Sequence, residues 1–159
     1  MKGLKDKLLL PVLLMTGVLL SAETKVLVHT DDNGVAVSGY DPVAFFEDGK
    51  PSKGHAKHRV VYQGALYFFV SRENQETFVA KPEKFEPRFG GYCPVSLAEE
   101  SLKPGDPQNF RIVDGELYLL HDSEAAEEFR SERISFVQRF WDKQVEENGL
   151  VYAPARSSP

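Results

Sequence analysis

The sequence repeats itself at a spacing of about fifty residues, and this repeat constrains the possible fold more than any other feature. Gly39-Tyr40-Asp41-Pro42-Val43 precedes Gly91-Tyr92-Cys93-Pro94-Val95 at an offset of 52 residues. After a slip of one residue the offset becomes 51, and glycines and aromatic residues return in the same order. Two copies are too few for a solenoid, so we expect two units packed face to face as a pseudo-symmetric pair. The matched pairs are Gly54 and Gly105, Gly64 and Gly115, Leu66 and Leu117, Tyr67 and Tyr118, Glu73 and Glu124, Phe78 and Phe129, and Phe85 and Phe136.

Each copy of the repeat predicts two strands followed by a helix. Asp114-Gly115 lies between two β-prone runs, which is a strong signal for a two-residue hairpin turn, and Gln63-Gly64 holds the same place in the first copy. Ser71 and Ser123 follow the hairpins and are expected to cap the helices, because a serine hydroxyl accepts a hydrogen bond from a free N–H of the first turn. The hairpins are expected over residues 59–62 with 65–70, and over 110–113 with 116–120.

The two helices are expected to end differently. Lys81-Pro82 ends or interrupts the first one, because the residue before a proline disfavours the helical conformation. The second copy lacks this proline, and its helix is expected to continue to Asn148-Gly149. Apolar residues recur there at steps of three and four, which predicts one buried helix face formed by Ile134, Val137, Phe140, Trp141 and Val145.

The chain is therefore expected to be an α+β protein in which two tandem β-β-α units form one small domain. An Asn33-Gly34 turn between short apolar runs predicts an additional β-hairpin ahead of the first unit. The expected divisions are an N-terminal hairpin over 23–38, the first unit over 39–90, the second unit with its C-terminal helix over 91–149, and a flexible tail over 150–159.

Residues 1–22 have the layout of a secretory signal peptide. Three lysines precede an apolar run over residues 8–20, and this run would span about 20 Å as a helix, which is too short for a hydrocarbon core of about 30 Å. We therefore expect an exported protein, periplasmic or secreted, without a stable membrane span after cleavage. The formal charge of −5 argues against a nucleic-acid partner.

Five motifs follow one another along the chain: Gly39-Tyr40-Asp41-Pro42-Val43, Tyr62-Gln63-Gly64-Ala65-Leu66-Tyr67, Ser71-Arg72-Glu73-Asn74, Pro82-Glu83-Lys84-Phe85-Glu86-Pro87 and Gly90-Gly91-Tyr92-Cys93. In this order they resemble a YHS domain, and the layout is similar to the exported bacterial branch of that family that has a single cysteine. The resemblance is strong over residues 35–93 and looser as far as Trp141, so the second unit reads as a degenerate copy. It implies a treble-clef-like fold in which cysteines on a turn and at a helix start bind a metal. YHS domains accompany copper-transporting ATPases and some multicomponent hydroxylases, which implies a copper-type ligand.

The sequence departs from the metal-binding pattern that the resemblance implies. The family's cysteine positions correspond to Ala44, Val70 and Asn74 in the first unit and to Ser96, His121 and Ala125 in the second. Among these six residues His121 alone is a good ligand for a soft metal. A structural zinc site needs about four ligands, so we do not expect a structural zinc site in this protein.

Cys93, the sole cysteine of the chain, leaves three interpretations open. Together with His121, Asp41 or a tyrosine it could bind a transition-metal ion; thiolate and imidazole together suit Cu(I) or a similar ion. It could be a reactive thiol, which needs a lowered pKa. It could also be a small buried hydrophobic residue. If the two Gly-Tyr-x-Pro turns face each other, Tyr40, Asp41, Tyr92 and Cys93 would line a ligand or interaction groove; otherwise the tyrosines belong to the core.

No catalytic motif is present: there is no phosphate-binding glycine loop, no Gly-x-Ser-x-Gly and no His-Glu-x-x-His. His55 and His58 read as part of a solvated loop before a strand. We therefore expect a non-enzymatic binding protein whose ligand is a transition-metal ion. The alternatives are a metal-free module that binds a protein or a small ligand and, with less support, a thiol-dependent redox protein.

Overall fold

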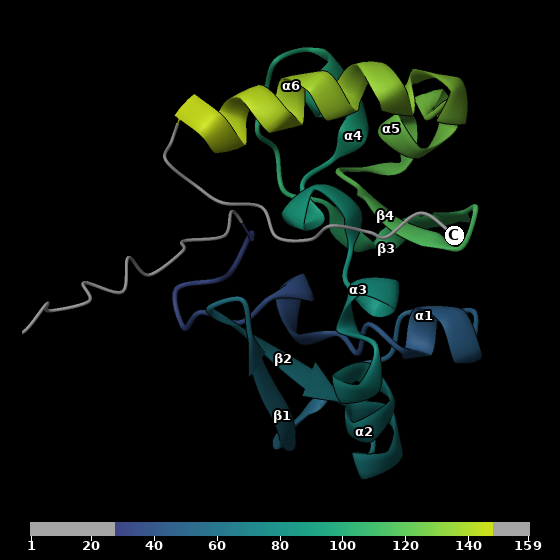
Figure 1. Ribbon diagram of the computed structural model, residues 1–159. Coiled ribbons are helices and arrows are strands. Elements are labelled where there is room, and N and C mark those ends of the chain that lie inside the picture. Colours follow the sequence, from purple (N-terminus) through teal and green to yellow (C-terminus); the bar gives the residue numbers. More distant parts are fainter. Residues whose placement is uncertain (1–27, 148–159) are drawn as a thin grey trace, which may run out of the picture.

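The computed structural model describes residues 28–147, and the order of its elements recurs in the two halves (Figure 1). The first half contains a 3-10 turn η1 (Val37–Gly39), α1 (Ala44–Glu47), β1 (His55–Tyr62), β2 (Ala65–Phe69), α2 (Arg72–Ala80) and α3 (Pro82–Phe85). The second contains η2 (Arg88–Gly91), α4 (Pro94–Ala98), β3 (Asp106–Val113), β4 (Glu116–Leu120), α5 (Ser123–Glu128), η3 (Ser131–Arg133) and α6 (Ile134–Glu147). The expected α+β class is confirmed, with two separate antiparallel hairpins, β1–β2 and β3–β4.

Equivalent backbone hydrogen bonds occur at the offsets of the repeat. The N–H of Gly54 donates to the Gly39 carbonyl at 3.0 Å, and the N–H of Gly105 donates to the Gly91 carbonyl at 2.9 Å. A Cβ on Gly54 would lie 2.4 Å from the carbonyl carbon of Phe68, so only glycine allows this close approach. The same spatial requirement therefore explains why a glycine recurs at both positions.

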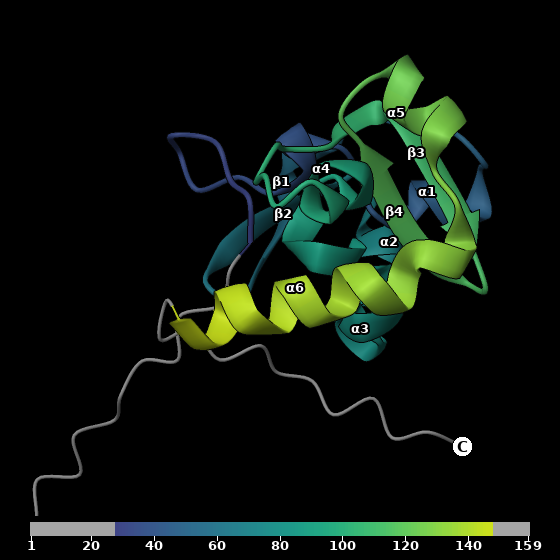
Figure 2. The same cartoon turned by 90° about the horizontal axis from the view of Figure 1, so that it is seen from above.

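Two hydrophobic clusters form the core, and the β3–β4 hairpin lies between them. Alternate residues of a strand point to opposite faces, and in β4 both faces are buried. Figures 1 and 2 show α6 running across α4 on the far side of this hairpin from β1 and β2. Leu117 and Leu119 belong to the first cluster with Val43, Phe45, Tyr67, Phe69, Phe78 and Phe85; Tyr118 and Leu120 belong to the second with Phe89, Cys93, Leu97, Val137, Trp141 and Val145.

The helix that was expected to continue through the second unit is interrupted. α5 ends at Glu128, and residues 129 and 130 have extended backbone conformations before η3 and α6 begin. This break lets the Phe129 ring pack against Tyr118, with ring centroids 5.3 Å apart. The break also ends the sequence correspondence, because Phe85 is buried whereas Phe136 is 47% exposed.

The helix caps agree with the prediction in the first unit and differ by one residue in the second. Ser71 caps α2 as predicted, and its hydroxyl accepts from the N–H of Asn74 at 3.1 Å. The prediction of Ser123 as the second cap was wrong: Asp122 is the N-cap of α5, and its carboxylate accepts from the N–H of Ala125 at 2.8 Å. Aspartate and serine are both favoured at this position, so either neighbour could cap the helix.

The segment ahead of the first unit has less β-structure than the hairpin expected over residues 23–38. Residues 23–27 lie outside the described part, as do the segments 1–22 and 150–159. Within the described part, one antiparallel bridge joins Thr30 and Ala36, and the chain then enters η1. Val35 instead makes a parallel bridge with Leu66 of β2. The approach to the first unit is thus fixed by contact with the β1–β2 hairpin.

No helix between residues 28 and 147 is both long enough and apolar enough to cross a membrane.

Candidate functional site

The two Gly-Tyr-x-Pro turns place Asp41 and Cys93 at equivalent positions of the backbone. The N–H of Asp41 donates to the Ser52 carbonyl, and the N–H of Cys93 donates to the Lys103 carbonyl, both at 2.9 Å. A short helix follows each turn, α1 after Asp41 and α4 after Cys93. The same local backbone therefore presents a carboxylate in one half and a thiol in the other.

Asp41 is completely buried, and its carboxylate accepts hydrogen bonds from two separate parts of the chain. Oδ1 accepts from the N–H of Val43 at 2.8 Å and from the N–H of Ala44 at 3.4 Å. Oδ2 accepts from the N–H of Val70 at 2.9 Å and from the side-chain amide of Asn74 at 2.7 Å. A buried carboxylate is tolerated when its lone pairs are satisfied in this way. We call this set of five residues the Asp41 cluster; it joins the turn to the start of α2.

The donors of the Asp41 cluster include all three positions that the family resemblance assigns to metal-binding cysteines. Ala44 and Val70 contribute backbone N–H groups, and Asn74 contributes its side chain. In a treble-clef-like site a metal ion would join the turn to the helix start. Here Asp41 makes that connection through hydrogen bonds.

Cys93 lies in the second hydrophobic cluster and is completely buried. Its apolar neighbours in that cluster include Leu97, Leu120 and Trp141. A thiol in such surroundings packs as a small hydrophobic residue, and the solvent access that a reactive thiol needs is absent. The structure therefore supports the third interpretation of Cys93 rather than the redox interpretation.

His121 lies on the surface at the junction between β4 and α5. Its Nδ1 is 2.9 Å from the carbonyl oxygen of Pro104, so this nitrogen carries the proton and donates. The imidazole lines an open polar hollow of about 220 Å³ with Glu99, Lys103 and Asp122, and Cys93 does not line it. Cys93 and His121 thus contribute to different environments, one apolar and one solvated.

The described residues do not fit a bound copper or other transition-metal ion. Between residues 28 and 147 there is no group of three or more His, Cys, Asp or Glu side chains that could hold a metal ion. The carboxylate of Asp41 is already satisfied by four donors, and Cys93 is a member of an apolar cluster. A soft metal ion prefers several thiolate or imidazole ligands, and the described residues do not assemble three candidate ligands around Cys93.

Tyr40 and Tyr92 make different contacts although they hold equivalent positions. The hydroxyl of Tyr40 accepts from the side-chain amide of Gln108 at 3.0 Å, and the Lys53 ammonium lies 4.1 Å from its ring centroid. Tyr92 packs its ring against Trp141, and burial raises the pKa of its hydroxyl. Because Asp41 and Cys93 are both completely buried, the structure gives no support to a ligand groove that the two side chains would line.

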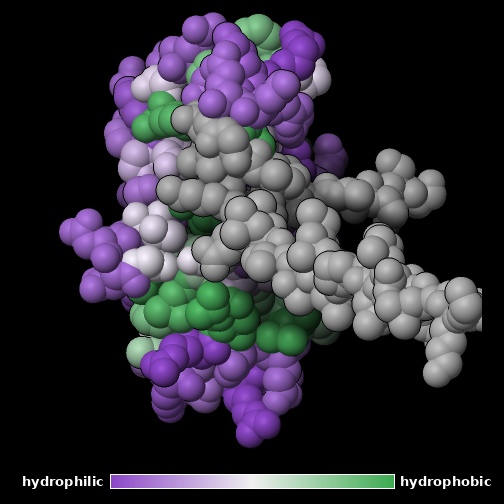
Figure 3. Space-filling model, turned by 60° about the vertical axis from the view of Figure 1, so that its left-hand side comes forward, coloured by the Kyte–Doolittle hydropathy of each residue, from purple (hydrophilic) through white to green (hydrophobic). Residues whose placement is uncertain are grey.

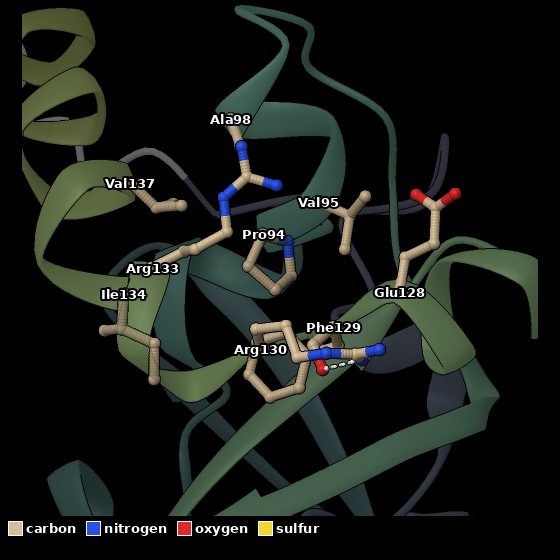
Figure 4. Close-up of a pocket in the computed structure, with 9 residues that line it drawn as sticks. All are labelled: Pro94, Val95, Ala98, Glu128, Phe129, Arg130, Arg133, Ile134 and Val137. Atoms are coloured by element: carbon tan, nitrogen blue, oxygen red, sulfur yellow. Dashed lines mark hydrogen bonds between the residues drawn. The ribbon is translucent and has the colours of Figure 1, made fainter.

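A small apolar hollow lies where α4, η3 and α6 meet (Figure 4). Pro94, Val95, Ile134 and Val137 form its apolar wall, and the stick view shows Arg133 extending over Pro94. Its volume of about 10 Å³ is at the lower limit for holding one water molecule, so it is too small for an organic ligand.

A larger groove of about 560 Å³ lies between β1 and one face of α2. Sequence reasoning missed it because it placed His55 and His58 in a loop, whereas both belong to β1. We call it the β1–α2 groove; it is lined by Lys57, His58, Arg72, Gln75, Glu76, Val79 and Ala80.

The charge of the sequence around the β1–α2 groove differs from that of the rest of the chain. Residues 49–72 contain five Lys or Arg, two His and no Asp or Glu. The rest of the chain contains the other 14 of the 19 basic residues and all 24 acidic residues. The matching segment of the second copy, residues 100–123, contains five Asp or Glu and two Lys or Arg. This acid-free run is the signal that could have indicated the groove from the sequence.

Comparisons with protein-family models, with curated proteins and with solved structures found no match to this chain.

Proposed function

We propose that the chain is an exported, YHS-type binding module that works without a metal ion, and that its role is non-enzymatic. The Asp41 cluster is the observation that carries this proposal. It makes the connection between turn and helix start for which the resembled family would use a metal. A tandem treble-clef-like arrangement of the two units is part of the proposal, and the equivalent hydrogen bonds at Gly39–Gly54 and Gly91–Gly105 support it.

A binding role is favoured over a catalytic one by where the polar groups lie. The buried carboxylate of Asp41 has its lone pairs taken up by backbone and amide donors, and the buried thiol of Cys93 lies in an apolar cluster. Both side chains are completely buried, so neither can contact a substrate in the folded protein. The accessible polar groups instead line the β1–α2 groove and the hollow at His121, and such open surfaces suit recognition of a partner.

Metal analysis and partner capture together test the proposal. The purified mature protein is expected to contain no stoichiometric copper or zinc, and its melting temperature is expected to be the same with and without a chelator. Immobilised protein is expected to capture a partner from the exported fraction in the presence of chelator, and soluble protein should compete for that partner. The proposal fails if a bound metal is required for folding or capture, or if no specific partner is captured.

A further inference from the structure

The edge of β1 that faces α2 has the form of a site for an extended peptide. The first sheet consists of β1 and β2 only, so the outer edge of β1 is not paired with another described strand. The β1–α2 groove lies beside this strand at Lys57 and His58, where the pairing of β1 with β2 is irregular, and a helix face forms its second wall. An edge strand beside a helix can accept an additional strand, because main-chain hydrogen bonds form with the edge and side chains enter the groove.

The helical wall of the groove is a single stripe of α2. Arg72, Gln75, Glu76, Val79 and Ala80 recur at steps of three, one, three and one, so they share one face of the helix. Phe78, on the opposite face, is buried and anchors α2 against the hairpin. The packing of Phe78 therefore fixes the position of α2, and with it the helical wall of the groove.

The β1–α2 groove combines basic and apolar groups. Lys57 is exposed on one wall; on the other wall Arg72 is exposed and forms an ion pair of 2.8 Å with Glu76, which also lines the groove. Val79 is 58% exposed and lines the groove; Val61 is 71% exposed but lies outside the groove. On the face shown in Figure 3, apolar surface forms a band across the lower part of the molecule between hydrophilic regions. A peptide that alternates acidic and apolar residues would match this surface.

The second hairpin provides an internal comparison. Its equivalent edge strand β3 contains Pro107, which has no N–H to donate to an added strand. Leu117 and Leu119 of this hairpin are buried, whereas the equivalent residues Leu66 and Phe68 of the first hairpin are partly exposed. Only the first hairpin therefore combines an edge without proline with basic groups and accessible apolar surface.

We propose that the β1–α2 groove binds an extended acidic–apolar segment of a partner protein, which adds to the edge of β1 as a third strand. This rests on the proposed binding role and identifies its partner chemistry. The backbone of β1 would pair with the segment, Lys57 would attract its carboxylates, and Val79 would contact its apolar side chains. Gln75 already bonds the Arg59 carbonyl at 3.0 Å, so an added strand would displace this bond in order to pair across Arg59.

Fluorescence anisotropy with the mature protein tests this proposal. The probe is a labelled peptide of about ten residues, the length of a long strand, that alternates Glu and Val. We expect saturable binding that weakens as salt is raised, and no binding of the matched Lys-Val peptide. The variant Lys57→Glu should weaken binding by about tenfold. The control Lys143→Glu makes the same charge change at an exposed position of α6 and should leave binding unchanged.

Strand addition is separated from simple charge attraction by N-methylating alternate residues of the Glu-Val peptide. This peptide keeps its charge and loses half of its backbone donors, so we expect its binding to be lost. Amide NMR shifts on binding should map to residues 57–61 and 72–80. Equal binding of the methylated peptide, or shifts outside these segments, would overturn the proposal. If Lys57→Glu still captures a natural partner as well as the wild type does, the binding role stands and the groove is excluded as its site.

Discussion

The Asp41 cluster makes a quantitative prediction, because removing one side chain leaves several buried donors without an acceptor. In Asp41→Ala the N–H groups of Val43 and Val70 and the amide of Asn74 lose bonds of 2.7–2.9 Å. Each buried donor left unsatisfied costs about 1–3 kcal/mol. Removing the carboxylate also relieves its own desolvation, and water can reach the half-buried Val70 and Asn74. We therefore expect a net loss of about 3 kcal/mol in the free energy of unfolding.

Two further variants show whether this loss comes from hydrogen bonding. Asp41→Asn keeps the shape, and its oxygen can still accept from the N–H of Val43, but its NH₂ would face the N–H of Val70. The Asn74 amide, which donates to the carboxylate oxygen that this NH₂ replaces, can turn to present its own oxygen to the new NH₂. The N–H of Val70 is then the donor left unpaired, and we expect a loss of about 1–2 kcal/mol. The control Asp31→Ala removes an exposed carboxylate that accepts from Asn33 and Val35 within one local turn, and it should cost about 1 kcal/mol or less.

Urea unfolding followed by circular dichroism and by Trp141 fluorescence provides the measurement. Trp141 lies in the second cluster, so coincident transitions would show that the loss of the Asp41 cluster destabilises both halves together. Chelator should leave all the midpoints unchanged. The reasoning is refuted if Asp41→Ala costs no more than Asp31→Ala, or if copper or zinc restores the stability of the variant.

Three other perturbations have definite expected outcomes. Cys93→Ala should cost only about 1 kcal/mol in urea unfolding, whereas Cys93→Asp should not fold at 25 °C, because the second half lacks an amide equivalent to that of Asn74. Gly54→Ala should cost about 2 kcal/mol or more by the same method, because its Cβ would lie 2.4 Å from the backbone of Phe68. Burial lowers the pKa of His29, and the charge of Asp31 partly offsets this shift. The unfolded state therefore binds the proton more tightly than the folded state, and stability falls as the pH drops below about 6.5. Over that pH range the melting temperature of His29→Gln should fall less than that of the wild type.

The sequence predicted the features of the fold that depend on local geometry. Turn glycines, hairpin spacing and the cap at Ser71 leave clear signals because the backbone requires particular residues there. The break between α5 and α6 left no comparable signal. It depends on Phe129 packing against Tyr118, and no proline or glycine marks the position. Likewise the early start of β1 at His55 depends on its pairing with Phe69 beyond an irregular register, which no local pattern shows.

The candidate site was predicted only in part, for a physical reason. The repeat correctly indicated that Asp41 and Cys93 hold equivalent positions, because the same backbone bonds fix both. The environment of each side chain depends on residues about thirty positions away, Val70 and Asn74 in one half and Leu120 and Ala125 in the other. Burial of this kind cannot be read from one position. The β1–α2 groove was missed for the same reason, since a strand edge and a helix stripe form it together.

The turns at Asp41 and Cys93 are held in place by different contacts, a set of hydrogen bonds in the first half and a hydrophobic cluster in the second. In the second half α6 extends over α4 and contributes Val137, Trp141 and Val145 to the cluster around Cys93, so hydrophobic packing holds the turn in place. Among the described residues, the first half has no long helix in that position, and α2 contributes one buried side chain, Phe78. The first turn packs into the other cluster through Val43 and Phe45, and the hydrogen bonds of Asp41 add a connection to the start of α2. The short α2 leaves one of its faces open beside β1, and this open face forms one wall of the groove proposed for the partner segment.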